Sequence, residues 1–196
     1  MIAKVKTYYL KDFVSSKEPK NGRFYTIAID GRGGSGKTVF AEYLKKLVPD
    51  FIFLNGDDYF EPVENQIVWG AFNDARFRQD IIKPLQHGNS FIYRPYDWHK
   101  EPHISEQPTA ITKGFCLERC FSFDFDLDWD LKIWVEAPKE VCLERGLARE
   151  HMPRERVLAA WQIWQVAEDN YIAQKQPEEL ADIVIDGTRP FKGQLV

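Results

Sequence analysis

Short apolar runs separated by glycine-rich or polar stretches recur along the chain. The first is FYTIAID at 24–30, which is rich in β-forming residues and ends at a glycine cluster. Similar runs follow at 51–55 (FIFLN), 109–112 (TAIT), 131–137 (LKIWVEA) and 181–186 (ADIVID). Uninterrupted apolar runs of this kind are typical of strands that are buried on both faces of a parallel sheet. We therefore expect these runs to form the central sheet.

Helical patterns lie between the apolar runs. Apolar residues recur every three or four positions after Lys37, and we expect further helices at 72–85, 139–150 and 153–173, with an amphipathic lead-in helix at 1–22. Short strands that alternate with helices imply right-handed crossovers, so helices should cover both faces of the sheet. The pattern predicts an α/β fold, a three-layer α/β/α sandwich around a mostly parallel sheet.

Composition limits the class of protein. With 196 residues and 44% hydrophobic content the chain can bury one core, so we expect a single domain over 1–196. Its net charge of -4 provides no broad positive surface, which disfavours nucleic acid and anionic membranes as partners. Its three cysteines show no CxxC spacing and no apolar run is long enough for a signal peptide or a membrane span, so we expect a cytoplasmic protein.

A glycine-rich segment, GRGGSGKT at 31–38, matches the pattern G-x-x-x-x-G-K-[ST] between a predicted strand and a predicted helix. Glycines let successive backbone N–H groups turn toward phosphate oxygens, and a helix N-terminus adds positive potential. Lys37 supplies a cation for the β- and γ-phosphates, and the hydroxyl of Thr38 is a ligand for Mg²⁺. The loop therefore predicts ATP and Mg²⁺ as cofactors. The residues expected to hold them are Gly31, Gly33, Gly34, Ser35, Gly36, Lys37 and Thr38.

An acidic pair, Asp57 and Asp58, follows the second predicted strand. A phosphate-binding loop alone fits a GTPase, a mechanical ATPase or a kinase, so this pair bears on the function. Because ligands of α/β sheets collect at the carboxyl ends of strands, one of these carboxylates can accept the proton of an attacking hydroxyl. We also expect Asp58 to help Thr38 hold Mg²⁺. The alternative is that both aspartates only cap the next turn.

Several motifs, taken in order, resemble one kinase family. They are IAIDGRGGSGKT, LNGDDYF, YRPYDWHKEP, DLKIWVEAP followed by a helix with arginines, and ADIVIDG, and they span about residues 24–187. They are similar to the uridine kinase family, in the wider group that contains nicotinamide riboside kinase and phosphoribulokinase. The phosphate-binding loop is common to the large P-loop class, whereas the order of the DDYF and YDW elements is more specific. The resemblance implies a P-loop NTPase fold with a short lid and ATP-dependent phosphorylation of a hydroxyl.

The resemblance also implies roles on the acceptor side. Asp57 occupies the first position of the family's D-x-[FY]-[FY] motif, which makes it the expected general base, and Tyr59 and Phe60 occupy the aromatic positions. Asp97 matches the aspartate that contacts the ribose hydroxyls of the acceptor; a surface turn is its alternative. A carboxylate beside Trp98 also suits a sugar, because it accepts paired hydroxyl bonds while the aromatic face covers the ring. The expected substrate-binding residues are Asp57, Asp58, Tyr59, Asp97 and Trp98.

By the same resemblance, residues 145–160 form a lid that closes over the transferring phosphoryl group. Planar guanidinium donors suit the spread negative charge of that group, and Arg145, Arg149 and Arg154 lie in this segment. Arg149 best matches the family's lid arginine and is the expected catalytic arginine, whereas Arg154 is expected to bind the nucleotide. A solvated helix face is the alternative for all three. Adenine is expected near 187–190.

One position departs from the family pattern. Relatives usually end the third buried strand in a glutamate before a glycine, near the Mg²⁺ water shell, whereas ITKGFCLER places Lys113 there. A cation beside the metal would repel it. We therefore expect either a rearranged metal site, to which Glu118 or Asp58 contributes, or a weakened enzyme.

An aromatic stripe that includes Trp161 and Trp164 recurs at nearly helical spacing. Such a stripe is more often a core or a subunit contact than a binding platform. A homodimer is therefore one expectation, and the tryptophans are not expected to bind substrate.

Three hypotheses for the function follow. The leading one is a small-molecule kinase that phosphorylates a nucleoside or another riboside with ATP and Mg²⁺. A second keeps the fold and changes the acceptor to pantothenate, a sugar phosphate or another hydroxylated metabolite. A third is a regulatory or degenerate protein that binds the nucleotide without efficient transfer, for which Lys113 is the main argument. The chain has no NKxD-like guanine motif, which disfavours a GTPase.

Overall fold

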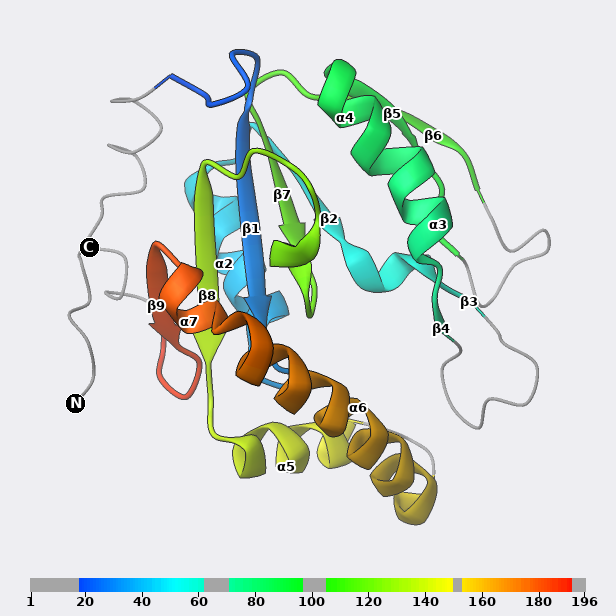
Figure 1. Ribbon diagram of the computed structural model, residues 1–196, viewed down its shortest axis with the longest axis vertical. Helices are drawn as coiled ribbons and strands as arrows, with labels where there is room; N and C mark the ends of the chain where they lie inside the picture. Colours follow the sequence, from blue (N-terminus) through cyan, green and yellow to red (C-terminus); the bar gives the residue numbers. More distant parts are fainter. Residues whose placement is uncertain (1–17, 62–70, 97–104, 150–152, 192–196) are drawn as a thin grey trace.

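A five-stranded parallel sheet forms the centre of the protein in the computed structural model, which describes residues 18–61, 71–96, 105–149 and 153–191 (Figure 1). Every neighbouring pair of strands in this sheet is parallel. The strands run in the order β2 (Phe51–Asn55), β7 (Gly114–Glu118), β1 (Tyr25–Gly31), β8 (Leu131–Glu136) and β9 (Ile183–Asp186). The strand order skips along the sequence, so the connections between parallel strands cross over the sheet.

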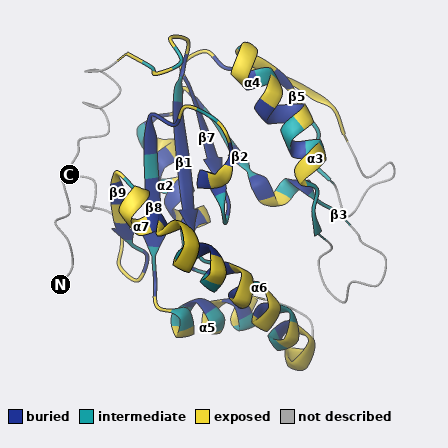
Figure 2. Cartoon of the chain, in the orientation of Figure 1, coloured by how far each residue is buried: buried dark blue, intermediate teal, exposed yellow. Residues whose placement is uncertain are grey.

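Helices cover both faces of the sheet, as the sequence predicts. On one face, Ile27 and Ile29 of β1 pack in a core cluster with Phe40 and Leu44 of α2 (Lys37–Leu47). On the other face, Ala28 joins a second cluster with residues of the segment from α3 to α4 and of α6. Neighbouring residues of β1 point to opposite faces because side chains alternate along a strand. The three-layer α/β/α architecture is therefore confirmed, and burial concentrates in the sheet (Figure 2).

The remaining elements lie around this sandwich. After β8 the chain forms α5, α6 and α7, and α5 and α6 lie near the carboxyl ends of the strands (Figure 1). Two antiparallel strand pairs, β3 with β4 and β5 with β6, lie outside the central sheet. The bounds are β3 (Phe60–Glu61), β4 (Ala71–Phe72), α3 (Asp74–Phe77), α4 (Lys83–His87), β5 (Ser90–Tyr93), β6 (Gln107–Ala110), α5 (Lys139–Arg149), α6 (Arg154–Lys175) and α7 (Pro177–Leu180).

The expectation that 109–112 forms an interior strand is wrong. The first two residues of this run belong to β6, which pairs antiparallel with β5 in a small hairpin and is mainly exposed. The third strand of the central sheet is instead β7, which lies between β1 and β2 and has all five of its residues buried. The two runs lie only a few residues apart, and the sheet takes the one that buries every side chain because both of its faces are covered.

The predicted helix at 72–85 is shorter and irregular. The chain first completes β4, and then Asn73 caps α3 by accepting a hydrogen bond from the N–H of Arg76 at 3.0 Å. A π-helical turn (Arg78–Ile82) connects α3 to α4, and Pro84 lies in the first turn of α4. Proline lacks the N–H that a regular helix would use there, and the widened π-helical turn before it accommodates the missing hydrogen bond.

The first residues only partly test the predicted lead-in helix. Residues 1–17 lie outside the described ranges, and residues 18–22 form a turn in which Gly22 N–H donates to the carbonyl of Pro19 at 2.8 Å. The predicted helix therefore does not extend to residue 22. Among the described helices, none has both the length and the apolar character needed to cross a bilayer.

Candidate active site

The glycine-rich segment forms a loop between β1, which ends at Gly31, and α2, which begins at Lys37. Gly34 and Gly36 adopt positive φ angles of 76° and 106°. A side chain at Gly34 would also clash, because its Cβ would lie 2.5 Å from the carbonyl oxygen of Cys142. Glycine is therefore required at Gly34 both for backbone conformation and for space. The loop leads directly into the N-terminus of α2, which is the geometry that binds phosphate.

Lys37 is held inside this loop and is only 6% exposed. Its Nζ donates to the carbonyl of Arg32 at 2.8 Å and to Sγ of Cys120 at 3.2 Å. Burial opposes the charge of Lys37, but Cys120, Glu118 and Asp57 around it outweigh burial and raise its pKa above the ordinary value. Lys37 therefore remains a cation at neutral pH, as phosphate binding requires.

Glu118 occupies the carboxyl end of β7, next to Thr38. The hydroxyl of Thr38 donates to Oε1 of Glu118 at 3.3 Å, and Glu118 is only 6% exposed. Burial raises the pKa of Glu118 to about 7, although Lys37 acts in the opposite direction. Thr38 and Glu118 thus present two oxygen ligands to the same space, and Mg²⁺ prefers oxygen ligands.

Lys113 does not occupy the position that the sequence pattern suggested. It precedes β7 and forms an exposed ion pair with Asp50 at 3.8 Å, at the opposite end of the strand from Glu118. The expected departure from the family pattern is therefore wrong, because it rested on the assignment of 109–112 as the third strand. Glu118, next to Thr38, is the residue at the carboxyl end of the actual third strand.

The two aspartates of the acidic pair face different surroundings. Asp57 is exposed and lines the cavity that also contains Lys37. Asp58 is half-buried, accepts a hydrogen bond from the hydroxyl of Tyr93, and is not among the residues that line this cavity. Asn55 caps the turn by accepting from the N–H of Asp57 at 3.0 Å. The structure therefore brings Asp57, and not Asp58, to the phosphate-binding loop.

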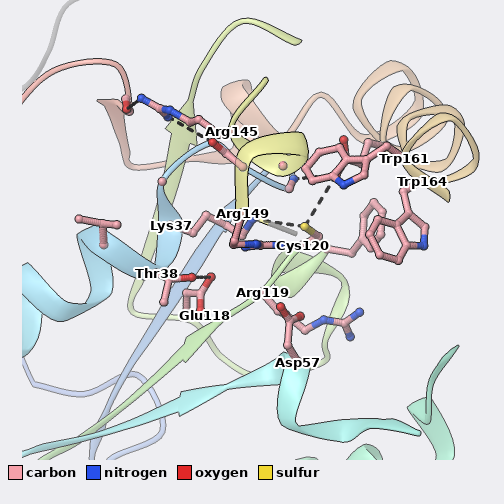
Figure 3. Close-up of a pocket in the computed structure, with 18 of the residues that line it drawn as sticks. Lys37, Thr38, Asp57, Glu118, Arg119, Cys120, Arg145, Arg149, Trp161 and Trp164 are labelled. Atoms are coloured by element: carbon pink, nitrogen blue, oxygen red, sulfur yellow. Dashed lines mark hydrogen bonds between the residues drawn. The ribbon is translucent and has the colours of Figure 1, made fainter. Parts of the chain in front are cut away.

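The loop and the carboxyl ends of the strands surround one cavity of about 850 Å³ (Figure 3). Such a volume accommodates a nucleotide-sized ligand. It lies at the edge of the sheet where ligands of α/β folds collect. The charged residues that line it are Lys37, Asp57, Glu118, Arg119, Arg145, Arg149, Glu168 and Arg189.

The three lid arginines differ in position. Arg149 lines the cavity, and Figure 3 shows it near Lys37. Arg145 also lines the cavity and donates to the carbonyls of Gly34 and Ser35, both at 3.2 Å, so it supports the phosphate-binding loop. Arg154 is exposed at the start of α6 and is not among the cavity residues. Residues 150–152, in the middle of the predicted lid, lie outside the described ranges.

Some of the other predicted binding residues line the cavity and some do not. Gly187 and the three residues that follow it line the cavity, as the adenine expectation requires. Tyr59 is fully buried in the core and accepts a hydrogen bond from the N–H of Arg94 at 3.2 Å, so it does not reach the cavity. Asp97 and Trp98 lie outside the described residues.

The tryptophans of α6 line the cavity, and the burial of Trp161 agrees with the expected core position. Trp161 is buried and Trp164 half-buried, and both line the cavity in edge-to-face contact at 6.1 Å between ring centroids. Gly146 of α5 makes room for Trp161, since a Cβ there would lie 2.0 Å from its ring. Because α6 crosses below the strand ends, its aromatic face points to the site rather than to the outside.

Sequence reasoning missed several residues that hold the loop. The carboxylate of Asp30, at the end of β1, accepts hydrogen bonds from Gly31 N–H at 2.7 Å and from the hydroxyl of Tyr171 at 2.7 Å. Glu168 of α6 accepts from Gly33 N–H at 2.7 Å. An aspartate at the end of an otherwise apolar strand was a usable signal for Asp30, because a buried charge requires partners. No local pattern singled out Glu168.

Comparisons with known proteins agree with this geometry. No protein family model matches the chain. A structure described as a possible uridine kinase from Bacillus stearothermophilus superposes with a TM-score of 0.61 at 15% identity, covering 90% of this chain and 99% of that one. The chain has the fold of the P-loop kinases.

Curated relatives confirm the resemblance seen in the motifs. The uridine kinase of Borrelia turicatae is 28% identical over 151 residues, which are 67% of this chain and 70% of that protein. Nicotinamide riboside kinase 2 of Mus musculus is 24% identical over 183 residues, which are 85% of this chain and 89% of that protein. Both relatives are named as small-molecule kinases, in agreement with the predicted class of enzyme.

Proposed function

We propose that this protein phosphorylates a hydroxyl group of a small riboside, with ATP as the phosphoryl donor and Mg²⁺ as the metal. One observation carries the proposal: a single cavity combines the phosphate-binding loop, the Thr38–Glu118 pair and the carboxylate of Asp57. A mechanical ATPase or GTPase has no need of a proton acceptor for a substrate hydroxyl. A kinase does, because the attacking hydroxyl must lose its proton.

The residues of the loop fit ATP and Mg²⁺. The Oγ of Ser35 is buried and has no hydrogen-bond partner, and Lys37 is charged within the loop. Thr38 and Glu118 supply oxygen ligands, and Mg²⁺ usually takes few ligands from the protein and the rest from phosphates and water. When bound, ATP supplies the phosphoryl group and Mg²⁺ neutralises charge on its oxygens.

Four residues of the site would act in this transfer. Asp57 accepts the proton of the acceptor hydroxyl, whose oxygen forms the new bond to the γ-phosphorus as the bond to ADP breaks. Lys37 and Arg149, which line the same cavity, balance the negative charge that spreads over the transferring group. Arg145 keeps the carbonyls of Gly34 and Ser35 in place, so it acts by positioning.

The riboside acceptor is supported by the motifs and by the relatives. The uridine kinases and nicotinamide riboside kinase 2 act on ribosides, by their names. Asp57 stands at the matching position of the family motif and lines the cavity. The cytoplasmic location expected from the cysteines, the single domain and the homodimer stay predictions.

The alternative of a degenerate nucleotide-binding protein loses its main argument. That argument was a lysine at the metal site, and Lys113 lies at the far end of β7, paired with Asp50. The cavity instead contains Glu118 next to Thr38. Nothing in the described ranges favours a protein that binds ATP without transferring phosphate.

The test is a kinetic comparison of three proteins. Wild type, Lys37→Ala and Asp57→Asn are incubated with Mg-ATP and a panel of ribosides, and both ADP and phosphorylated acceptor are measured. We expect Asp57→Asn to bind ATP as wild type does but to lose about 100-fold or more in kcat, the scale of general-base catalysis. Lys37→Ala should lose ATP affinity as well.

The controls separate folding from chemistry. Lys139→Ala removes a lysine that pairs with Asp169 on the surface, outside the cavity, and should retain full turnover. Phosphorylation of no acceptor by wild type that binds Mg-ATP would contradict the proposal. An unchanged kcat in Asp57→Asn would remove Asp57 as the base.

A further inference from the structure

Arg119 is a buried arginine that makes no ion pair with a carboxylate of the described residues, although the carboxylate of Asp57 lies on the same side of the cavity. It follows Glu118 on β7, is only 7% exposed, and lines the cavity. Its Nε has no hydrogen-bond partner, and its guanidinium makes no ion pair with any residue of the described ranges. Buried guanidinium groups are normally paired, because an uncompensated buried charge is costly.

Nearby arginines show the usual arrangement. Arg76 pairs with Glu61, Arg78 pairs with Asp74 at 2.7 Å, and Arg94 pairs with Asp80 at 2.7 Å. All three are more exposed than Arg119, and each still has a carboxylate. Within the described ranges, the absence of an ion pair at Arg119 is therefore a property of its own site and not of this region.

The side chain of Arg119 is held in place by aromatic packing. Its guanidinium carbon lies 3.5 Å from the ring centroid of Phe72 and 5.2 Å from that of Phe125. Gly56 provides the space for its stem, since a Cβ at Gly56 would lie 2.5 Å from Cδ of Arg119. The position of the charge is thus fixed before any ligand binds, which lowers the cost of binding.

Arg119 lies on the acceptor side of the cavity. Figure 3 shows its guanidinium beside the carboxylate of Asp57, on the side away from Lys37. Phe72, on which it stacks, belongs to β4 and pairs with β3, which directly follows the Asp57 turn. The donor phosphates already have Lys37 and the loop amides, so an anion at Arg119 belongs to the other substrate.

We propose that Arg119 binds an anionic group, a carboxylate or a phosphate, on the acceptor molecule. The inference rests on the proposed function and narrows its substrate class from a riboside in general to one that carries a negative charge. A planar guanidinium offers paired donors to either group. The buried position makes this contact strong, and it makes the site reject a neutral acceptor that leaves the charge unpaired.

Two matched pairs of acceptors test the proposal. Uridine and orotidine differ by a ring carboxylate, and uridine and uridine 3′-phosphate differ by a phosphate on the ribose. We expect wild type to favour the anionic member of one pair by about 10- to 100-fold in kcat/KM, the scale of a hydrogen bond to a charged group. The favoured pair identifies the carboxylate or the phosphate as the recognised group.

Variants assign this preference to Arg119. In Arg119→Met the ratio of kcat/KM between anionic and neutral acceptors should fall toward one, and Arg119→Lys should retain part of it. Arg78→Met is the matched control, because Arg78 also stacks on Phe125, at 5.0 Å, but does not line the cavity. In Arg78→Met the ratio of kcat/KM between anionic and neutral acceptors should equal that of wild type.

Thermal unfolding distinguishes binding from a structural role. Without ligand, Arg119→Met should have a Tm equal to or above that of wild type, because it removes a buried charge that makes no ion pair in the described ranges and keeps an apolar side chain against Phe72 and Phe125. A Tm several degrees lower, with equal loss toward both members of each pair, would overturn the proposal. So would a wild type that shows no preference within either pair.

Thermal unfolding also tests the anion site if the proposed kinase reaction fails. If no acceptor is phosphorylated, the binding of orotidine and of uridine 3′-phosphate is measured instead, as a rise in Tm in the presence of Mg²⁺ and a nonhydrolysable ATP analogue. A rise in wild type that is lost in Arg119→Met would support the anion site without the kinase reaction. No rise in wild type would overturn it.

Discussion

Replacement of Glu118 by glutamine should stabilise the metal-free protein at alkaline pH. Burial raises the pKa of Glu118 from its ordinary value of 4.5 to about 7. A carboxyl group whose pKa is higher in the folded than in the unfolded chain binds its proton more strongly when folded. The contribution of Glu118 to the free energy of unfolding is therefore most favourable below about pH 4.5. It falls as the pH rises to about 7 and stays at the lower level above that.

The size of the effect follows from the two pKa values. Their difference corresponds to about 3 kcal/mol, at about 1.4 kcal/mol for each pKa unit. Glutamine cannot ionise, so Glu118→Gln should raise the free energy of unfolding by about 3 kcal/mol at pH 8 and by only about 1 kcal/mol at pH 5. The same change should impair turnover, because Glu118 faces Thr38 at the expected Mg²⁺ position.

Urea denaturation in EDTA at the two pH values measures this prediction. Glu144→Gln, an exposed glutamate of α5, is the control and should change stability by less than about 0.5 kcal/mol. The Mg²⁺ concentration that half-saturates turnover should rise in Glu118→Gln. A variant that is less stable than wild type at pH 8, or equally affected at both pH values, would refute the reasoning.

Three further substitutions probe the supports of the site. Asp30→Asn should lower the free energy of unfolding by about 3 kcal/mol, because an amide N–H₂ would face hydrogen-bond donors in a buried position; urea denaturation measures it. Gly146→Ala should displace Trp161 and lower the free energy of unfolding by about 1–3 kcal/mol. Gly88→Ala, where a Cβ meets only an ordinary contact at 3.5 Å, should lower it by less. If Trp161 is displaced, ATP binding should change the tryptophan fluorescence of Gly146→Ala less than that of wild type. Lys113→Ala should leave kcat within about twofold and stability within about 1 kcal/mol, since its ion pair is exposed; a large loss of activity would restore Lys113 to the site.

The elements that the sequence predicted well are those with strong local signals. The run at 24–30 and the glycine motif after it are adjacent in the chain, so their geometry follows from local rules. Strands β8 and β9 were found for a similar reason, as uninterrupted apolar runs between helices. The alternation of strands and helices was sufficient to predict the three layers.

The third strand was missed because two β-rich runs compete within a few residues. TAIT and GFCLE both suit a strand, and length alone does not separate them. The signal that decides is the exposure of alternate positions: Pro108 and its neighbours lie on an exposed hairpin, whereas GFCLE is buried throughout. Because the wrong run was taken as the third strand, Lys113 was expected at the strand end beside the metal, a position that Glu118 holds in the structure.

The site residues that were missed depend on contacts between distant segments. Trp161 reaches the cavity because α6 crosses the ends of the strands, and Arg119 matters because Phe72, far away in sequence, covers it. Helical spacing alone gave Trp161 an outward or core position. Such contacts are set by tertiary packing, which a periodic pattern does not encode.

A crystal structure with Mn²⁺ in place of Mg²⁺ and a nonhydrolysable ATP analogue tests the central claim most directly. Anomalous scattering would locate the metal. We predict that it lies between the Thr38 hydroxyl and the Glu118 carboxylate, with the phosphates on the loop and the terminal phosphate facing Asp57. A metal or a nucleotide bound elsewhere, with the loop empty, would contradict the account.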